Sequence, residues 1–483
     1  MPDGSHPGGS LTQVSDKMGR TINAEEIVAD ANSFDIVILG AGSGGYACAL
    51  RAVQLGLTVA IIEKDKVGGT CLHYGCIPTK AFLHAAEVAD TARHGSSIGV
   101  NSSLESVDMG KVVSYKQGVI DRLYKGLQGL MKTDAITVVQ GAGKVVDKNT
   151  VEVDGTRYTG KNLVLATGSV PRTLGVEIGG RVMTSTEALE MQDVPKSAVI
   201  IGGSVIGVEF ASVWNSFGTD VTIIEGLPSL VPLEDPVLSK GLERAFRKRK
   251  IKFKTGVKFQ SVEQTDSGAT VTLENGDTID TDVVLVAVGR GPNSEGMGFE
   301  DAGVTVDRGW VPTDERLKTN VDGVFAVGDL VPGLQLAHRG FAHGIFVAEE
   351  IAGLKPAPVV DSGIPRVTYC EPELASVGLT EAQAKEKYGD IETIEYNLGG
   401  NGKSQILQTS GLVKLVREKD GPIVGVHMLG ARMGEQIGEA SVIVNWEAYP
   451  EDVAQFIHAH PTQNESLGEA ALALAGKPLH SHA

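Results

Sequence analysis

The chain has 483 residues, 42% of them hydrophobic and 21% charged, which is the composition of a globular protein with room for about three domains. Its formal net charge of −17 argues against a nucleic acid or an anionic membrane as partner, because both require basic surfaces. No apolar run reaches membrane-spanning length, and no signal peptide is visible. Because four cysteines are too few for a secreted disulfide framework, we expect a cytoplasmic protein.

The first folded elements that the sequence predicts form a βαβ unit. Residues 1–33 are rich in Gly, Ser, Pro and Asp, and we expect them to be a flexible tail. The apolar run 34–39 predicts a buried parallel strand. A Gly-Ala-Gly-Ser-Gly-Gly turn at 40–45 follows, then a helix over 46–55 and a second strand over 58–62. This order is typical of a dinucleotide-binding unit.

Each glycine of this turn has a physical role. Gly40 permits the tight turn, Gly42 lets the backbone approach a pyrophosphate, and Gly45 lets the helix pack on the strand. The unpaired N–H groups at the start of the helix favour phosphate. Glu63 ends the second strand, where a carboxylate accepts hydrogen bonds from a ribose. We therefore predict a dinucleotide site here.

The stretch 68–80 reads Gly-Gly-Thr-Cys-Leu-His-Tyr-Gly-Cys-Ile-Pro-Thr-Lys and precedes a helix-like run over 81–91. On one regular helix, Cys71 and Cys76 would have Cα atoms roughly 8–9 Å apart, whereas a disulfide tolerates less than about 7 Å. A bridge therefore requires a bend, for which Gly75 is suited. The alternative is two reduced structural thiols. A metal site is disfavoured, because no second Cys or His pair stands at ligand spacing.

The βαβ pattern recurs later in the chain. A strand over 197–201 is followed by a Gly-Gly-Ser-Val-Ile-Gly turn at 202–207, a helix over 208–217 and a strand over 221–224. The strand ends at Glu225, 23 positions after the first glycine of the turn, which is the spacing found in the first unit. Equal spacing indicates an internal duplication of a nucleotide-binding unit. The alternative is a βαβ unit with a purely structural role.

Two residues of this second unit bear on its ligand. Ser204 takes the place of the middle glycine, where its side chain narrows the approach to a pyrophosphate but could also donate a hydrogen bond to it. Glu225 suits a free ribose 2′-hydroxyl and repels a 2′-phosphate. Since no Arg or Lys occurs over 225–229, we expect NAD in preference to NADP.

The remaining elements complete an α/β chain. Apolar strands that end in glycine turns are expected at 163–169, 283–290 and 324–329, and antiparallel strands at 144–158 and 257–280. From about residue 361 we expect a separate C-terminal domain, with strands near 366, over 411–417 and over 423–429, then helices.

The end of the chain carries His-Ala-His-Pro-Thr-Gln-Asn-Glu at 458–465. A histidine with a nearby carboxylate is a candidate general base. His458 and His460 are both candidates. We select His460 because Glu465 stands five residues on, across a proline that favours a turn.

These motifs together resemble the FAD-dependent pyridine nucleotide–disulfide oxidoreductases over the chain from about residue 34 to near its end. The resemblance rests on Gly-Gly-Thr-Cys-x4-Cys-Ile-Pro-Thr-Lys at 68–80 and on the motifs at 166–169, 289–293, 326–329 and 369–373. Within that family, the segments around Cys71, around 336–338 and at 458–462 resemble the members that oxidise dihydrolipoamide, the E3 components of 2-oxo acid dehydrogenase complexes.

The resemblance implies the chemistry. A Cys71–Cys76 redox disulfide would be reduced by dihydrolipoamide and would pass electrons through FAD to NAD⁺. Cys71 would be the exchange thiol and the more exposed, and Cys76 the thiol against the flavin. His460, assisted by Glu465, would be a base supplied by the other subunit of a homodimer. The substrate group would sit on a lipoyl-bearing acyltransferase (E2) or carrier protein.

The resemblance also implies the cofactor contacts. Lys80 and Glu209 would form an ion pair near the reactive nitrogen of the flavin. The FAD contacts would be Gly40, Gly42, Gly45, Glu63, Lys80, Gly143, Thr167, Gly168, Ser169, Asp329, Leu336, Ala337 and His338. The NAD contacts would be Gly202, Gly203, Ser204, Ile206, Gly207, Glu209, Glu225, Val257 and Gly289. Cys48 and Cys370 match no redox motif and are expected to be buried thiols.

The expected fold is α/β, with two Rossmann-like dinucleotide-binding domains and a C-terminal α+β dimerisation domain. After the tail, 34–165 would be the first part of the FAD domain, 166–289 the NAD domain, 290–360 the second part of the FAD domain, and 361–483 the dimerisation domain.

Two departures from the family pattern and two rival functions remain. The family commonly has Gly where Ser204 stands, and this departure concerns the affinity for NAD. It commonly has Ser where Asn464 stands, and this departure concerns local packing.

One rival function is that of an NADPH-dependent disulfide or metal-ion reductase of the same fold, which Glu225 opposes. The other is a non-catalytic scaffold, which the intact Cys71, Cys76 and His460 oppose.

Overall fold

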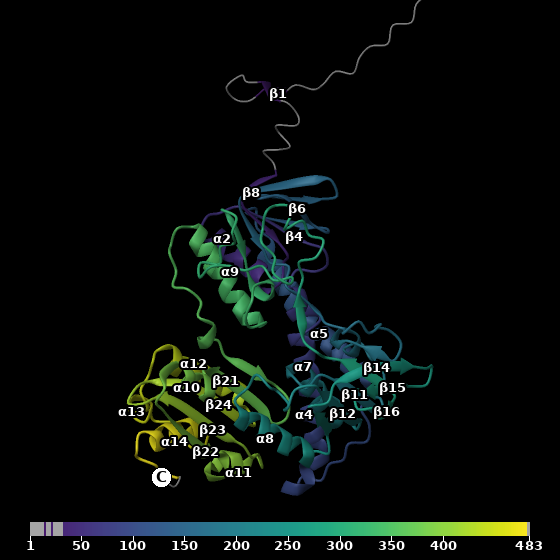
Figure 1. The fold of residues 1–483 in the computed structure, drawn as a ribbon, viewed down its shortest axis with the longest axis vertical. Coiled ribbons are helices and arrows are strands. Elements are labelled where there is room, and N and C mark those ends of the chain that lie inside the picture. The colour runs from purple at the N-terminus through teal and green to yellow at the C-terminus, as the bar shows by residue number, and fades with distance from the viewer. Residues whose placement is uncertain (1–13, 16–20, 23–31, 481–483) are drawn as a thin grey trace, which may run out of the picture. The chain divides into compact units, whose positions relative to one another are not determined.

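The computed structural model describes residues 14–15, 21–22 and 32–480, so the flexible tail expected over 1–33 falls almost wholly outside the described residues. Contacts within the chain divide it into two compact units (Figure 1). Unit 1 comprises Met1–Val67, Gln128–Gly168 and Pro292–Pro358, and unit 2 comprises Gly68–Leu127, Ser169–Gly291 and Val359–Ala483. The segment Gly68–Leu127, which carries both predicted redox cysteines, thus groups with the second unit. We keep the five-part functional division as a proposal.

Unit 1 is built on a sheet in the order β5–β4–β3–β8, with β19 beside β8. The strands are β3 (Ser33–Leu39), β4 (Val59–Glu63), β5 (Ile136–Gln140), β8 (Thr156–Leu165) and β19 (Val324–Ala326). All these pairs are parallel, so their carboxyl ends meet at one edge of the sheet. The first half of β8 also pairs antiparallel with β7 (Thr150–Val153), which pairs with β6 (Lys144–Asp147), as the alternating sequence predicted.

Two helices of unit 1 lie side by side (Figure 1). They are α2 (Ser43–Gln54) and α9 (Ala337–Ile351), and the 3₁₀ turn η2 (Gly328–Leu330) precedes the second. Their close approach requires glycine, because a Cβ atom at Gly344 would lie 2.2 Å from the carbonyl oxygen of Gly44. Helix α2 begins three residues before the predicted start, directly after the extended residue Gly42.

Unit 2 contains a second parallel sheet, in the order β10–β17–β11–β12–β13. Its strands are β10 (Val182–Met183), β11 (Ser197–Ile201), β12 (Asp220–Glu225), β13 (Lys252–Thr255) and β17 (Val283–Val286). Helix α7 (Val205–Phe217) follows β11, and α8 (Pro236–Lys248) follows β12. An antiparallel sheet of β14 (Phe259–Gln264), β15 (Ala269–Leu273) and β16 (Thr278–Thr281) confirms the alternating pattern predicted over 257–280.

The N-terminal part of unit 2 is helical. It contains α3 (Gly69–His73), α4 (Cys76–His94), η1 (Gly95–Ile98) and most of α5 (Met109–Met131). Side chains of α4 share one hydrophobic core with α7 and the parallel sheet, through residues such as Phe82, Phe210 and Trp214. The helix that follows the predicted redox cysteines is therefore held against the predicted NAD domain by buried apolar contacts. The short elements α6 (Ser185–Ala188), β9 (Ser169–Pro171) and β18 (Arg290–Pro292) complete this part.

The C-terminal part of unit 2 is an antiparallel sheet in the order β20–β21–β24–β23–β22. Its strands are β20 (Arg366–Thr368), β21 (Glu373–Gly378), β22 (Ile391–Asn397), β23 (Leu412–Glu418) and β24 (Ile423–Gly430). The helical elements are η3 (Asp361–Gly363), α10 (Glu381–Tyr388), η4 (Leu398–Gly400), α11 (Gly402–Ile406), α12 (Met433–Asn445), α13 (Pro450–Val453) and α14 (Glu465–Leu474). The sequence prediction missed β21 and β22.

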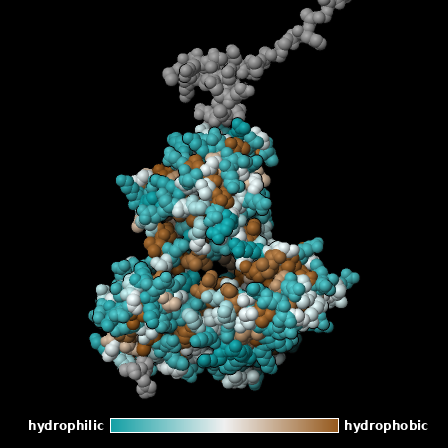
Figure 2. Space-filling model, in the orientation of Figure 1, coloured by the Kyte–Doolittle hydropathy of each residue, from teal (hydrophilic) through white to brown (hydrophobic). Residues whose placement is uncertain are grey.

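The visible surface of the chain is mainly hydrophilic, with small hydrophobic patches (Figure 2). None of the helices within the described residues is both long and apolar enough to cross a membrane.

Candidate dinucleotide sites and redox centre

The first glycine-rich turn lies between β3 and α2, at the edge where the parallel strands of unit 1 end. Gly40 has φ of +100°, and a Cβ atom there would lie 2.4 Å from the carbonyl oxygen of Ala166. A Cβ atom at Gly45 would lie 1.9 Å from the Gly40 carbonyl oxygen. A Cβ atom at Gly42 would have none of the surrounding atoms within 4 Å, so this position faces open space. The turn therefore has the geometry that a bound pyrophosphate requires.

The other FAD contacts expected in unit 1 follow neighbouring strands at this edge. Glu63 ends β4, and its two carboxylate oxygens accept hydrogen bonds from the backbone N–H groups of Ala41 (2.8 Å) and Asp65 (2.9 Å). The remaining residues follow β5, β8 and β19 or begin α9: Gly143, Thr167, Gly168, Asp329, Leu336, Ala337 and His338. A Cβ atom at Gly340 would lie 2.5 Å from Ser43 Oγ, which places the first turn of α9 beside the start of α2.

The second glycine-rich turn repeats the contacts of the first. A Cβ atom at Gly202 would lie 2.3 Å from the Ala287 carbonyl oxygen, and one at Gly207 would lie 1.9 Å from the Gly202 carbonyl oxygen. Ser204 has φ −87° and ψ −168°, close to φ −70° and ψ −170° at Gly42. Serine therefore fits this backbone without strain, and its side chain occupies the direction that is open in the first turn.

Glu225 is the centre of the second site. The residue is 8% exposed, and its carboxylate accepts hydrogen bonds from the N–H groups of Gly203 and Leu227, both at 2.7 Å. The N–H of Val257 donates to the Glu225 carbonyl oxygen at 3.2 Å. The expected contacts Ile206, in the first turn of α7, and Gly289, after β17, lie at the same carboxyl edge of the sheet.

Both edges fit a dinucleotide. Each combines a turn that excludes a Cβ atom, a helix N-terminus and an acidic residue at the end of the next strand, which is the arrangement that holds a pyrophosphate and a ribose.

Sequence reasoning missed Lys258, which lies close to Glu225: its Cγ would lie 3.5 Å from a Cβ atom at Gly226. Its ammonium group pairs with Glu274 at 3.8 Å. Ser169, expected near FAD, accepts hydrogen bonds from Arg290 at Oγ (2.7 Å) and at its carbonyl oxygen (2.6 Å).

The two predicted redox cysteines lie on two consecutive helices, the first short and the second long, with a bend between them. Cys71 is on α3, Cys76 is the first residue of α4, and Tyr74 and Gly75 break the helical path between them with φ of −135° and −142°. The predicted bend is thus confirmed, and the bridge itself stays a prediction. Cys71 is half-buried and Cys76 is exposed, so the expectation that Cys71 is the more exposed thiol is wrong for this structure.

The other two cysteines are buried, as expected. Cys48 is 0% exposed and Cys370 is 1% exposed. Burial raises the pKa of the Cys48 thiol to about 12. Burial, with the nearby charge of Glu209, also raises the pKa of Cys370 well above its usual value. Both thiols are therefore protonated and unreactive at neutral pH.

Lys80 and Glu209 form the ion pair that the family resemblance implied. Lys80 Nζ lies 2.9 and 2.8 Å from the two carboxylate oxygens of Glu209, which is 3% exposed. Burial lowers the pKa of Lys80, but the charge and hydrogen bonds of Glu209, with a contribution from Cys76, outweigh it and raise the pKa overall. Sequence reasoning missed Tyr369 as a partner: its N–H donates to Glu209 at 2.9 Å, and its ring centroid lies 4.8 Å from Lys80 Nζ.

His460 and Glu465 also form a pair within unit 2. His460 Nδ1 lies 2.7 Å from one carboxylate oxygen of Glu465, and the other oxygen accepts the N–H of Thr462 at 2.7 Å. The His460 side chain is 78% exposed. Its Cε1 atom lies 4.0 Å from a Cβ atom built at Gly402, so within one chain His460 neighbours α11.

His458, the other candidate base, is nearly buried and paired with a carboxylate of its own domain. Its side chain is 11% exposed, and its Nε2 atom lies 2.9 Å from Glu439 on α12. The second carboxylate oxygen of Glu439 accepts a hydrogen bond from the amide of Asn464. The hydrogen bond to Glu439 raises the pKa of His458 above its ordinary value. This geometry favours His460 as the base, and it shows that Asn464 joins a specific hydrogen-bond network.

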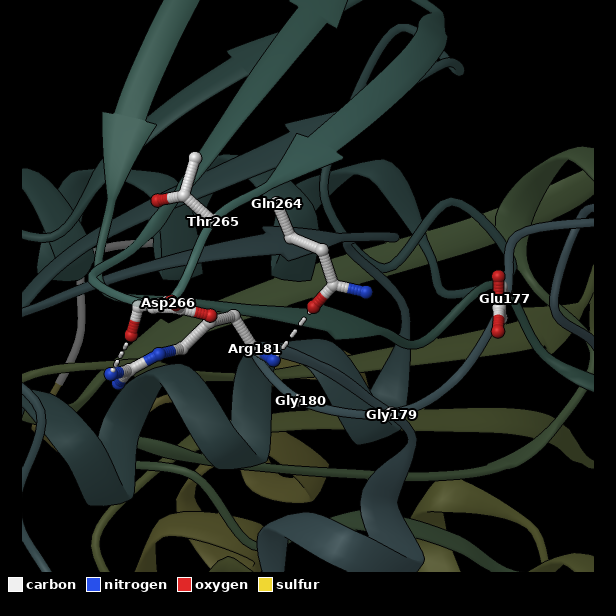
Figure 3. A pocket seen from close by; sticks show the side chains of 7 residues that line it. All are labelled: Glu177, Gly179, Gly180, Arg181, Gln264, Thr265 and Asp266. Atoms are coloured by element: carbon white, nitrogen blue, oxygen red, sulfur yellow. Dashed lines mark hydrogen bonds between the residues drawn. The ribbon is translucent and has the colours of Figure 1, made fainter.

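A pocket of about 510 Å³ lies elsewhere in unit 2 (Figure 3). Its lining contains none of the predicted site residues and consists of Glu177, Gly179, Gly180, Arg181, Gln264, Thr265 and Asp266. Arg181 already has partners within the fold: its backbone N–H donates to Gln264 Oε1 at 2.9 Å, and its guanidinium donates to the carbonyl oxygen of Asp266 at 2.7 Å. Among residues 14–15, 21–22 and 32–480, no group of three or more His, Cys, Asp or Glu side chains is placed to hold a metal ion.

Comparison with protein families gives two matches that together cover most of the chain. Residues 34–344 match the pyridine nucleotide-disulphide oxidoreductase family, and residues 364–471 match the dimerisation domain of the same family. The chain belongs to the pyridine nucleotide-disulphide oxidoreductase family. The expected α/β fold and C-terminal dimerisation domain are confirmed, and the dimerisation domain supports a homodimer.

Curated relatives refine the function. Two proteins of Bacillus subtilis named dihydrolipoyl dehydrogenase are each 40% identical to this chain, over 93% and 92% of it and 100% and 97% of their own length. The dihydrolipoyl dehydrogenase of Geobacillus stearothermophilus is 38% identical over 92% of this chain and 97% of its own. These relatives support dihydrolipoyl dehydrogenase function, with FAD and NAD(H) as cofactors.

Solved structures agree on the fold. LpdA of Mycobacterium tuberculosis aligns with a TM-score of 0.85, at 23% identity over 91% of this chain and 99% of its own. The HOCl-induced flavoprotein disulfide reductase RclA of Escherichia coli, solved as a Cu(II) complex, aligns with a TM-score of 0.83, at 25% identity over 92% of this chain and 100% of its own.

Proposed function

We propose that this chain oxidises dihydrolipoyl groups with NAD⁺ through Cys71, Cys76 and His460, as the E3 component of a 2-oxo acid dehydrogenase complex. The observation that carries the assignment of roles is the start of α4. Cys76 stands at the positive end of a 19-residue helix, and Lys80 follows one turn later. Both features stabilise a thiolate, because helix N-termini and nearby cations lower thiol pKa values.

The dithiol step uses the chain's own groups. Glu465 occupies Nδ1 of His460, which leaves Nε2 to accept a proton from the dithiol. The resulting thiolate attacks Cys71 Sγ, breaks the Cys71–Cys76 bond and displaces Cys76 as a thiolate. The second substrate thiol then attacks the mixed disulfide, which releases Cys71 and leaves the substrate as a cyclic disulfide. Two electrons and the protons have then moved from the substrate to the cysteine pair and its base.

FAD, when bound in unit 1, supplies the chemistry that passes these two electrons to NAD⁺ as a hydride. The chain's part is to hold the cofactors. The Gly40 turn and Glu63 would hold the adenosine end of FAD, and the Gly202 turn and Glu225 would hold NAD. Glu209 keeps Lys80 charged beside Cys76, so that the thiolate has a fixed cation one turn away.

Partner and location follow from this chemistry. The exposed His460 lies within the dimerisation-domain match and neighbours α11, so we assign it to the active site of the other subunit. The partner would be a lipoyl-bearing acyltransferase or a lipoyl carrier protein. We place the reaction in the cytoplasm, because a close cysteine pair in a chain with four cysteines suits redox catalysis in a reducing compartment.

The deciding experiment compares substrates. The purified holoenzyme is assayed with dihydrolipoamide and NAD⁺, and in the reverse direction with lipoamide, oxidised glutathione and Cu(II), each with NADH and with NADPH. We expect turnover of the lipoamide couple with NAD(H) to exceed every other combination. Faster reduction of glutathione or Cu(II), or a preference for NADPH, would identify a different reductase of the same family.

A further inference from the structure

The two acidic side chains of α14 share one face of the helix but serve different partners. Glu465 and Glu469 are one turn apart, and the charges of both contribute to the raised pKa of the buried Tyr396 on β22, which burial and these carboxylates bring to about 12. Glu465 pairs with His460, which precedes the helix. Glu469 pairs with His480, which follows it.

Glu469 depends on the C-terminal segment for its hydrogen bonds. The Glu469 side chain is 10% exposed. One of its oxygens lies 2.8 Å from His480 Nδ1, and the other accepts the backbone N–H of His480 at 3.0 Å. A carboxylate this buried is costly unless it is paired, so loss of His480 leaves an uncompensated charge one turn from Glu465.

His480 also contacts the segment beside His460, the proposed base. A Cβ atom at Gly400 would lie 3.1 Å from the His480 carbonyl oxygen and 3.0 Å from the Tyr396 hydroxyl. The next residue, Asn401, donates a hydrogen bond to the Thr462 carbonyl oxygen at 3.0 Å. His480 therefore contacts two elements. One is α14, which carries Glu465. The other is the turn η4, which is followed directly by Asn401, the residue that hydrogen-bonds the loop carrying His460.

We propose that His480 is a positioning residue for the His460–Glu465 pair: it satisfies Glu469 and so fixes the first turns of α14 against η4. This inference rests on the proposed role of His460 as the base. His480 itself contacts no reacting atom. Its effect reaches the dithiol step through the placement of Glu465, and the two dinucleotide sites do not depend on it.

Two truncations of the full chain that differ by one residue test the proposal. A chain ending at His480 keeps the contact, and a chain ending at Leu479 loses it. We expect the chain ending at Leu479 to show a kcat for dihydrolipoamide oxidation that is roughly tenfold lower, since small misplacements of catalytic groups cost up to about 10² in rate. The chain ending at His480 should stay within about twofold of the full-length enzyme.

A second assay separates positioning from loss of folding. NADH-dependent reduction of ferricyanide bypasses the dithiol and should be equal in both truncated holoenzymes, as should their dimer content. Substitution Glu469→Gln removes the charge that needs a partner, so adding it to the chain ending at Leu479 should recover most of the lost kcat. The exposed pair His84–Glu87 on α4 provides the control, and His84→Ala should change neither assay.

Three kinetic outcomes would overturn the inference: equal dihydrolipoamide rates in the two truncated chains, a parallel fall in ferricyanide reduction, or no recovery with Glu469→Gln. A crystal structure of the chain ending at Leu479 gives a readout that is independent of substrate. We expect His460 Nδ1 to move out of hydrogen-bonding distance of Glu465, and an unchanged 2.7 Å contact would refute the proposal. A full-length enzyme that reduces ferricyanide but does not oxidise dihydrolipoamide would refute the proposed function alone.

Discussion

Lys80 on α4 and Glu209 on α7 form an ion pair in which one ammonium group contacts both carboxylate oxygens, at 2.9 and 2.8 Å. The two residues are 129 positions apart in the chain. Their contact holds α4, which begins at Cys76, against α7, which follows the second glycine-rich turn. One buried carboxylate, that of Glu209, therefore connects the helix of the predicted redox centre to the predicted NAD domain.

Removing the cation of this pair should destabilise the protein. In Lys80→Met, Glu209 loses the cation and keeps the hydrogen bond from the Tyr369 N–H, and breaking a buried pair on one side costs about 3 kcal/mol or more. Urea unfolding of the holoenzyme measures the change. The exposed pair Lys252–Asp220 is the control, and Lys252→Met should cost less than about 1 kcal/mol. Equal effects of the two substitutions would contradict this prediction.

Cofactor choice should depend on Glu225. Its carboxylate stands where a 2′-phosphate would be repelled, and a single repulsive contact of about 1.4 kcal/mol corresponds to tenfold in kcat/KM. We expect NADP⁺ to be used at least about tenfold less well than NAD⁺. Comparable kcat/KM values for NAD⁺ and NADP⁺ would contradict the prediction that Glu225 selects NAD⁺. The double variant Glu225→Ala, Glu274→Ala, which also frees Lys258, should narrow the gap between the cofactors.

Ser204 should weaken NAD⁺ binding. Its backbone matches that of Gly42, so Ser204→Gly introduces no new conformation and only clears the space beside the expected pyrophosphate. We expect a lower KM for NAD⁺ with little change in the KM for dihydrolipoamide. A rise in the KM for NAD⁺ would show instead that the hydroxyl donates a hydrogen bond to the phosphate.

The His458–Glu439 pair should make stability depend on pH. The pKa of His458 is raised, so its contribution is fully present below the unfolded value of about 6.5 and is lost as pH rises through the folded pKa. Glu439 has a lowered pKa, because the hydrogen bonds and charge of His458 outweigh burial, so its contribution is lost toward acid. Glu439→Gln should therefore destabilise the protein more at pH 6 than at pH 9.

Urea unfolding at the two pH values measures this difference. Glu435, which is exposed one turn earlier on α12, supplies the control, and Glu435→Gln should have no pH-dependent effect. An equal loss of stability at pH 6 and pH 9 in Glu439→Gln would mean that the charge of His458 plays no part.

The base and the disulfide should come from different subunits. We expect inactive Cys71→Ser and inactive His460→Gln chains, unfolded and refolded together, to recover activity, because random pairing makes about half of the dimers hybrids with one intact site each. Activity should reach roughly a quarter of wild type. Well-folded hybrids without activity would place base and disulfide in one chain, and an active His460→Gln enzyme would remove His460 from the mechanism.

Local pattern was enough to predict much of this protein. Both βαβ units, their glycine-rich turns and their terminal acids Glu63 and Glu225 follow from apolar periodicity and from backbone positions where a Cβ atom has no room. The bend between Cys71 and Cys76 follows from helix geometry. The family resemblance named the Lys80–Glu209 pair and the His460–Glu465 pair, and the structure brings each of them within hydrogen-bonding distance.

Tertiary packing decided the rest. Strand β21 was missed because it is buried along most of its length and so lacks a two-residue period. Strand β22 was missed because charged residues interrupt its apolar ones, and both strands are defined by their partners in the sheet. No local pattern predicts the exposure of Cys76 or the grouping of Gly68–Leu127 with unit 2. The same holds for the pairing of Glu439 with His458 and of Glu469 with His480. Local pattern and the family resemblance were enough to name the residues that we propose for the chemistry. Only the folded chain showed that His458 meets Glu439 and that His480 meets Glu469, because these pairs join side chains that packing of the C-terminal elements brings together and no local pattern predicts.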